Sequence, residues 1–315
     1  MPHIAIVLSP GFEMMCFAAI SAFEAANVAA GEKQYVVTIL SERGGLVKNT
    51  LGAGLETEPF IEPGSFDTVI AGGLIKPVPS SPGLISYFQA AGERCRRVAS
   101  ICTGAFILAE AGLLDGRRTT THWFFARELQ SRFPQVLMEE DRIFIIDGHI
   151  WTSAGMTAGI DLALGMIEKD YGAELARSAA QLLVVYHRRA GGQSQHSMLL
   201  TMNAKSDRIQ SALLFARQNL RLTLSVEDLA EVANLSPRQF SRAFRAETGQ
   251  TPARAVENLR VEAARLMLEQ SRHTLDEIAI ENGFTDRERM RRAFLRTFGQ
   301  PPQAIRRAAR FGAEA

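Results

Sequence analysis

The sequence predicts an α/β domain with a doubly wound parallel sheet, followed by an all-α domain with two helix-turn-helix units. Residues 1–190 alternate short β-branched runs with helical stretches, which is typical of a parallel sheet covered on both faces. Residues 206–310 have a helical pattern throughout and contain one motif twice. The polar segment AGGQSQHSM after Arg189 predicts a linker. We therefore expect domains at 1–189 and 206–315 with a linker at 190–205.

In the first domain, the predicted parallel strands are residues 3–8, 35–40, 68–71 and 97–101, and residues 142–152 predict a hairpin around Asp147-Gly148. The predicted helices are residues 14–29, 82–93, 103–111, 123–132, 157–171 and 173–188. In doubly wound sheets, ligands bind beyond the carboxyl ends of the strands. We therefore expect residues 10–13, Gly72-Gly73 and the Ile101-Cys102 turn to meet at one cleft.

The motif in the second domain occurs twice, about fifty residues apart. The matching positions are Phe240, Phe244, Gly249 and Pro252 in the first copy and Met290, Phe294, Gly299 and Pro302 in the second. Ser236 and Asp286 are predicted to cap two helices, the first with Pro237 at its first position. Residues 253–270, with Leu259, Ala263, Leu266 and Met267 on one face, predict a rigid helix that joins the copies.

The two capped helices are predicted to bury one face and to expose arginines on the other. The buried faces would hold Phe240, Ala243 and Phe244 in the first helix and Met290, Ala293 and Phe294 in the second. The outward residues, our DNA-binding candidates, are Arg238, Gln239, Ser241, Arg242 and Arg245, then Arg287, Glu288, Arg289, Arg291 and Arg292. Such faces suit insertion into a major groove, although an arginine run is also common on a solvated helical surface.

The charge distribution supports a nucleic-acid partner for the second domain. Residues 201–315 hold 19 Lys and Arg against 14 Asp and Glu, a net of +5, whereas residues 1–200 have a net of −4. All but one of those basic residues are arginine, which forms bidentate contacts to phosphate and guanine.

On these residues, the region from 206 to 310 resembles the DNA-binding domain of the AraC/XylS transcriptional regulators. The positions that carry the resemblance include Leu229-Ala230, Ser236, Phe240, Arg242, Gly249 and Pro252, then Ile278-Ala279, Gly283-Phe284, Asp286, Met290, Arg292, Gly299 and Pro302. The resemblance implies that two recognition helices enter successive major grooves of double-stranded operator DNA. It also implies RNA polymerase as a partner if the chain is an activator, the commoner mode in that family.

The expected cleft contains a cysteine with a histidine twenty residues further on. Cys102 follows an apolar strand and precedes a helix opened by Thr103, so the helix dipole is expected to lower its thiol pKa. His122, beside Trp123, could pair with the thiol, and the Gly72-Gly73 amides could form an oxyanion hole. A buried structural cysteine would explain the same residue.

Residues 1–190 resemble the class I glutamine amidotransferase-like superfamily, in the PfpI-like branch of the flavodoxin-like fold. The resemblance places Cys102 on the nucleophile elbow and His122 on the family's histidine, and the whole chain resembles the GlxA-type branch of AraC regulators. Cys16 stands where those enzymes have an acidic residue, and Glu13 lies three residues earlier, either in the cleft or facing solvent. We therefore expect a sensor domain and not an enzyme.

The predicted effector site contains Glu13, Cys16, Gly72, Gly73, Cys102, Thr103, His122 and Trp123. The resemblance suggests an amino-acid or quaternary-amine metabolite as effector. Two alternatives stay open: a cysteine-dependent hydrolase or amidotransferase-like enzyme fused to a DNA-binding domain, and a thiol redox sensor that uses Cys16 and Cys102.

Bulk properties narrow the class further. The chain has no apolar run long enough for a membrane span and no signal-peptide pattern, so a cytoplasmic location is expected. Three cysteines without metal-type spacing predict neither a disulfide framework nor a metal site, and no cofactor is expected. A homodimer is expected because paired half-sites raise affinity, and residues 173–188 could be its interface or simply core.

Overall fold

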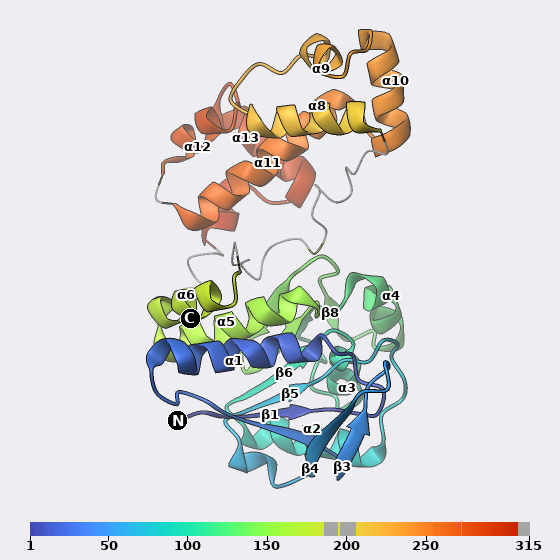
Figure 1. Cartoon of the computed structure of the whole chain (residues 1–315), viewed down its shortest axis with the longest axis vertical. Helices are drawn as coiled ribbons and strands as arrows, with labels where there is room; N and C mark the ends of the chain where they lie inside the picture. The colour runs from blue at the N-terminus through green and yellow to red at the C-terminus, as the bar shows by residue number, and fades with distance from the viewer. Residues whose placement is uncertain (186–194, 196–205, 272, 308–315) are drawn as a thin grey trace. The chain divides into compact units, whose positions relative to one another are not determined.

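The computed structural model describes residues 1–185, 195, 206–271 and 273–307 (Figure 1). The chain divides into two units, Met1–Gln195 and His196–Ala315, and each is described by itself. Apart from Gln195, the expected linker at 190–205 lies outside the described residues, as do the expected helix ends at 186–188 and 308–310.

The first unit is built on one eight-stranded sheet. Its strands are β1 (His3–Val7), β2 (Val36–Ser41), β3 (Arg43–Lys48), β4 (Gly54–Pro59), β5 (Thr68–Ala71), β6 (Arg97–Ile101), β9 (Phe144–Asp147) and β10 (Ile150–Ser153). Their order is β3-β4-β2-β1-β5-β6-β10-β9. The central pairs are parallel, whereas β3–β4 and β9–β10 are antiparallel. The predicted parallel strands and the hairpin around Gly148 are therefore confirmed.

Two pairings were not predicted. β3 and β4 form an edge hairpin, and β3 contains Gly44 and Gly45, both with positive φ (70° and 78°). Glycine is depleted in strands, so this segment carries no strand signal in the sequence. A second small sheet pairs β7 (Arg118–Thr119) with β8 (Leu137–Met138).

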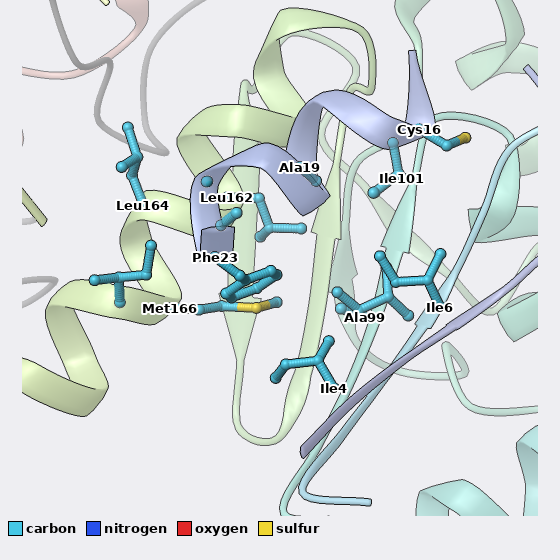
Figure 2. Close-up of a cluster of buried hydrophobic side chains, with 14 of the residues drawn as sticks. Ile4, Ile6, Cys16, Ala19, Phe23, Ala99, Ile101, Leu162, Leu164 and Met166 are labelled. Carbon is cyan, nitrogen blue, oxygen red and sulfur yellow. The ribbon is translucent and has the colours of Figure 1, made fainter. Parts of the chain in front are cut away.

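Helices cover both faces of the large sheet. They are α1 (Cys16–Ala30), α5 (Thr157–Tyr171) and α6 (Ala173–Leu182) on one face and α2 (Pro82–Arg94), α3 (Gly104–Glu110) and α4 (Trp123–Arg132) on the other, with a short 3₁₀ turn η1 (Pro63–Ser65) before β5. Side chains of β1 alternate between the two cores. Ile4 and Ile6 pack with Phe23 and Leu162 on the first face (Figure 2), whereas Val7 joins the second core. The doubly wound architecture is thus confirmed.

α6 is shorter than predicted. It ends at Leu182, and Val184 adopts a left-handed φ of 55°, a conformation that stops a helix and is unfavourable for a β-branched residue. Leu182 and Val184 are exposed, at 52% and 87%. The prediction of a helix over 173–188 is therefore wrong beyond Leu182 within the described residues.

The second unit is helical and has two separate cores. Its described helices are α8 (Asp207–Gln218), α9 (Val226–Val232), α10 (Pro237–Thr248), α11 (Pro252–Gln270), α12 (Leu275–Glu281) and α13 (Arg287–Phe298). Phe240 and Phe244 of α10 lie in the first core with α8 and α9. Met290 and Phe294 of α13 lie in the second core with α12. Each helix-turn-helix unit thus has its own core.

α11 contributes to both cores from different sides. Its first half buries Ala255, Val256 and Leu259 in the first core. Its second half buries Val261, Ala264 and Leu268 in the second. At about 100° per residue, the two sets lie roughly half a turn apart around the helix axis. The predicted joining helix is therefore confirmed. Its buried residues lie on two opposite faces, one for each helix-turn-helix unit, and not only on the predicted face of Leu259, Ala263, Leu266 and Met267.

Candidate functional site

The recognition-type helix of the first helix-turn-helix unit, α10, is capped as predicted and buries the predicted face. The Ser236 hydroxyl accepts a hydrogen bond from the Gln239 N–H at 3.4 Å, and the Ser236 N–H donates to Gln239 Oε1 at 3.2 Å, which forms a capping box. Burial of Phe240 and Phe244 leaves Arg238, Arg242 and Arg245 exposed, with Ser241 half-buried. Gln239 is exposed, but its carboxamide oxygen already serves the cap.

The corresponding helix of the second helix-turn-helix unit, α13, has more ion pairs on its outer face. Oδ1 of Asp286 accepts from the Arg289 N–H at 2.7 Å, as expected for a cap. Met290, Ala293 and Phe294 are fully buried, so Arg287, Glu288, Arg289 and Arg292 face outward. Both Glu288 carboxylate oxygens accept from Arg291, at 2.8 and 2.9 Å. Glu288 and Arg291 therefore partly neutralise each other.

Between α11 and α13 lies a groove of about 420 Å³ that the sequence analysis missed. Four arginines, Arg260, Arg289, Arg292 and Arg296, line it together with Glu257. Arg296 donates to Glu257 at 2.7 Å, and Arg260 donates to the Leu222 carbonyl at 2.7 Å. The prediction ended at Arg292, although a spacing of three and four residues puts Arg289, Arg292 and Arg296 on one helix face.

In the α/β unit, residues 1–195, Cys102 occupies a sharp turn between β6 and α3. Its φ is 56°, a left-handed conformation that strains a residue other than glycine. The turn is tightly packed, because a Cβ on Gly155 would lie 2.7 Å from Cys102 Cα. The Cys102 N–H donates to the Ser153 carbonyl at 3.1 Å, and the Thr121 hydroxyl donates to the Cys102 carbonyl at 2.8 Å. The elbow geometry implied by the resemblance is therefore present.

Glu13 points into the protein beside this elbow. It is only 7% exposed, and its N–H donates to the Gly73 carbonyl at 2.9 Å. Burial raises the pKa of both Cys16 and Cys102, and the Glu13 carboxylate adds to that rise. Among the described residues, its Oε2 is buried without a hydrogen-bond partner. The alternative that Glu13 faces solvent is therefore wrong.

The expected activation of Cys102 by the helix dipole is also wrong. Burial raises the pKa of the Cys102 thiol to about 12, although the Thr103 backbone N–H opposes the rise. α3 has only seven residues, and Cys102 is 3% exposed, so desolvation outweighs the dipole. The thiol is protonated at neutral pH.

The two glycine amides do not form an oxyanion hole. The Gly72 N–H donates to the Val7 carbonyl at 2.9 Å, and the Gly73 N–H donates to Cys16 Sγ at 3.1 Å. Both donors are therefore already engaged. Burial also raises the pKa of Cys16 to about 12, which keeps this sulfur neutral.

The remaining predicted residues lie around the elbow in supporting positions. The Thr103 hydroxyl bonds the N–H and the carbonyl of Leu74, both at 2.7 Å. His122 Nδ1 accepts from the Phe124 N–H at 3.3 Å and so caps α4, which puts the proton of a neutral ring on Nε2. Trp123 is 46% exposed. Thr121, which contacts the elbow directly, was not predicted.

Together these features define a class. Two capped helices, each with an apolar inner face and an arginine-bearing outer face and joined by one helix, are the geometry of a double helix-turn-helix DNA-binding protein. The attached α/β unit has a nucleophile-elbow turn with a protonated thiol and no available oxyanion donors at Gly72 and Gly73. None of the described helices is long and apolar enough to cross a membrane.

Comparisons with known proteins agree with this class. Residues 3–169 match the DJ-1/PfpI family, and residues 229–308 match a helix-turn-helix domain. The chain is 31% identical to the HTH-type transcriptional regulator CdhR of Pseudomonas aeruginosa, over 95% of this chain and 90% of that protein. It is 30% identical to the HTH-type transcriptional regulator GlxA of Rhizobium meliloti, over 97% and 95%.

A crystal structure of an AraC family transcriptional regulator from Pseudomonas putida shares the fold of the first unit. Its TM-score is 0.54 at 22% identity, over 58% of this chain and all of that one. The chain therefore belongs to the DJ-1/PfpI family, and within it to the HTH-type transcriptional regulators with an AraC-type DNA-binding domain.

Proposed function

We propose that this regulator senses a small molecule in the cleft around Cys102 and transmits its presence to operator DNA. The sensing residues are Glu13, Cys16, Gly72, Gly73, Cys102, Thr103, His122 and Trp123. The DNA-binding residues are those on the outer faces of α10 and α13. The proposed setting is a cytoplasmic homodimer, with RNA polymerase as a further partner if it activates transcription.

The main support for the proposed effector site is the buried Glu13 carboxylate oxygen, which has no hydrogen-bond partner among the described residues. A buried acceptor without a hydrogen bond costs about 1–3 kcal/mol, and more when it is charged. A ligand that supplies an N–H donor removes this cost. The unpartnered Glu13 oxygen therefore favours a metabolite with an amino or ammonium group, and an amino acid fits better than a quaternary amine, which has no N–H to donate.

The same cleft argues against hydrolysis. Because burial raises the pKa of the Cys102 thiol to about 12, the thiol stays protonated at neutral pH and is a poor nucleophile. The amide of Gly73 bonds Cys16 and is not free to stabilise an oxyanion. A Cys102→Ser variant should therefore keep its effector response, whereas a hydrolase-dependent regulator would lose it.

On the DNA side, the first helix-turn-helix unit is proposed to read bases with Arg238 and Arg242, whose side chains are exposed and form no ion pair with any described residue. The second helix-turn-helix unit is proposed to present Arg287, Arg289 and Arg292 to the DNA. A dimer would place two such pairs of helices on neighbouring half-sites, and exposed Leu182 and Val184 at the end of α6 are candidates for its interface.

Thermal denaturation of the full chain with a panel of amino acids and quaternary amines tests the effector site. A specific ligand at about 100 times its Kd stabilises the folded protein by about 2.7 kcal/mol. Glu13→Gln should abolish this shift, while Glu24→Gln, an exposed carboxylate on α1, should keep it. An equal shift for wild type and Glu13→Gln would place the effector elsewhere.

A further inference from the structure

Gln195, from the predicted linker, is bound to the surface of the sensor unit. Its side-chain Oε1 accepts from the Trp123 N–H at 2.8 Å. Its Nε2 donates to the carbonyls of Thr121, Glu140 and Arg142 at 2.8, 3.0 and 3.0 Å. Its backbone N–H donates to Asp141 Oδ1 at 2.7 Å. The side-chain oxygen, the side-chain nitrogen and the backbone N–H of this one residue thus all form hydrogen bonds at one site on the sensor unit, which we call the receptor site.

The receptor site is built for a carboxamide. Nε2 also lies 3.2 Å from Thr120 Oγ1, so four oxygens surround a group with two N–H donors, and the one facing N–H takes the carbonyl oxygen. Glutamate could not replace glutamine here, because a carboxylate would face these oxygens without a hydrogen to donate.

The same segment that binds Gln195 contacts the elbow. The Thr121 carbonyl accepts from Gln195, while the Thr121 hydroxyl donates to the Cys102 carbonyl. Thr120 and Thr121 are fully buried, so they cannot shift without moving both contacts. A ligand that displaces the elbow therefore acts directly on the linker site.

The contact also shortens the tether to the DNA-binding unit. The described part of that unit starts at Ser206, whose N–H and hydroxyl donate to the Glu247 carboxylate at 2.9 and 2.8 Å. With Gln195 bound, the connection from residue 195 to residue 206 spans at most about 37 Å. Without the Gln195 contact, the nearest described residue of the sensor unit is residue 185, and the 21 residues from there to residue 206 can span at most about 71 Å.

We propose that Gln195 is a latch: its carboxamide holds the linker on the sensor unit beside the elbow, and an effector in the cleft releases it. The release raises the upper limit of this span by about 34 Å, close to one turn of DNA. The latch thereby sets which half-site spacings a dimer can span. This inference rests on the proposed function for its effector and its dimer.

The test compares full-length wild type with Gln195→Glu, and uses Gln89→Glu, an exposed glutamine on α2, as the matched control. Hydrogen exchange at the Trp123 amide reports the latch itself. Gln195→Glu should speed this exchange about tenfold or more, because repulsion between the carboxylate and the surrounding carbonyl oxygens moves the side chain, and with it the acceptor, away from the Trp123 N–H. The control should match wild type, and an unchanged exchange rate in Gln195→Glu would overturn the latch.

A second measurement addresses the tether. The probe is a duplex with two half-sites selected by the full chain from a random library, with and without one added helical turn between them. The added turn should weaken wild type about tenfold and Gln195→Glu about threefold or less. Equal losses in the two proteins would overturn the control of spacing.

The connection to the elbow has its own variant. Thr121→Val removes the hydroxyl that bonds Cys102 but keeps the carbonyl that binds Gln195, so it should also speed Trp123 exchange. No change would refute the connection. These measurements use no effector, so the latch can fail while effector binding at Glu13 stands, and the reverse holds as well.

Discussion

Replacing Cys102 with alanine isolates the energetic effect of its buried thiol. Burial raises the pKa of this thiol from 9.0 to about 12. Because the folded pKa lies above the unfolded one, the thiol's contribution to stability is present below pH 9 and is lost as the pH rises toward 12. At about 1.4 kcal/mol per pKa unit, wild type should lose about 1 kcal/mol more than Cys102→Ala between about pH 8 and about pH 10.

Urea unfolding followed by tryptophan fluorescence measures this difference. Both tryptophans of the chain, Trp123 and Trp151, lie in the first unit, so the signal reports on the unit that contains Cys102. Ser100→Ala is the control, because it removes a fully buried hydroxyl that does not titrate in this range. If the gap between wild type and Cys102→Ala stays constant with pH, burial does not control the pKa of this thiol. If wild type instead gains stability over Cys102→Ala as the pH rises, the helix dipole lowers the thiol pKa as the sequence predicted.

Two further predictions concern the DNA-binding unit. Arg242→Ala should cost about 1–3 kcal/mol of binding free energy for the selected duplex and relax one base preference, as measured by fluorescence anisotropy across single-base variants of that duplex. Arg217→Ala, on the exposed face of α8, is the control. An equal loss of affinity on every sequence would make Arg242 a phosphate contact. Gly283→Ala should destabilise the unit more than Gly249→Ala. Both glycines have positive φ, which costs about 1–2 kcal/mol for alanine, but only at Gly283 would a Cβ also clash with the Leu220 carbonyl. Equal melting temperatures of the two variants would contradict this reasoning.

The parts of the fold that follow from local patterns were predictable. β5 and β6 are short runs buried on both faces, and α10 begins at a serine followed by proline, so their positions could be read directly. The β3–β4 hairpin could not, because Gly44 and Gly45 give it no strand signal. The two faces of α11 could not be separated either, because the periodicity of one helix does not say how many partners it has.

For the site, the sequence located residues but not their electrostatics. Cys102 and Glu13 lie where the cleft was expected, yet the direction of the thiol pKa shift depends on how deeply surrounding chain buries it. The partner of the Gly73 N–H is a side chain fifty-seven positions away, which no local pattern reveals. Gln195 was treated as part of a linker, since one polar residue in a polar segment carries no signal.

One residue, Cys16, changes two features that catalysis at the elbow would need. Cys16 stands where related enzymes have an acidic residue, and its sulfur accepts the Gly73 N–H, so it removes a proton acceptor and an oxyanion donor together. What remains is a strained turn at Cys102 and a buried, unpartnered Glu13 oxygen, and both cost stability. Local violations of folding rules concentrate at functional sites. Two such costs side by side, linked through Thr121 to the proposed Gln195 latch, support the proposal that the elbow binds a ligand and signals its presence.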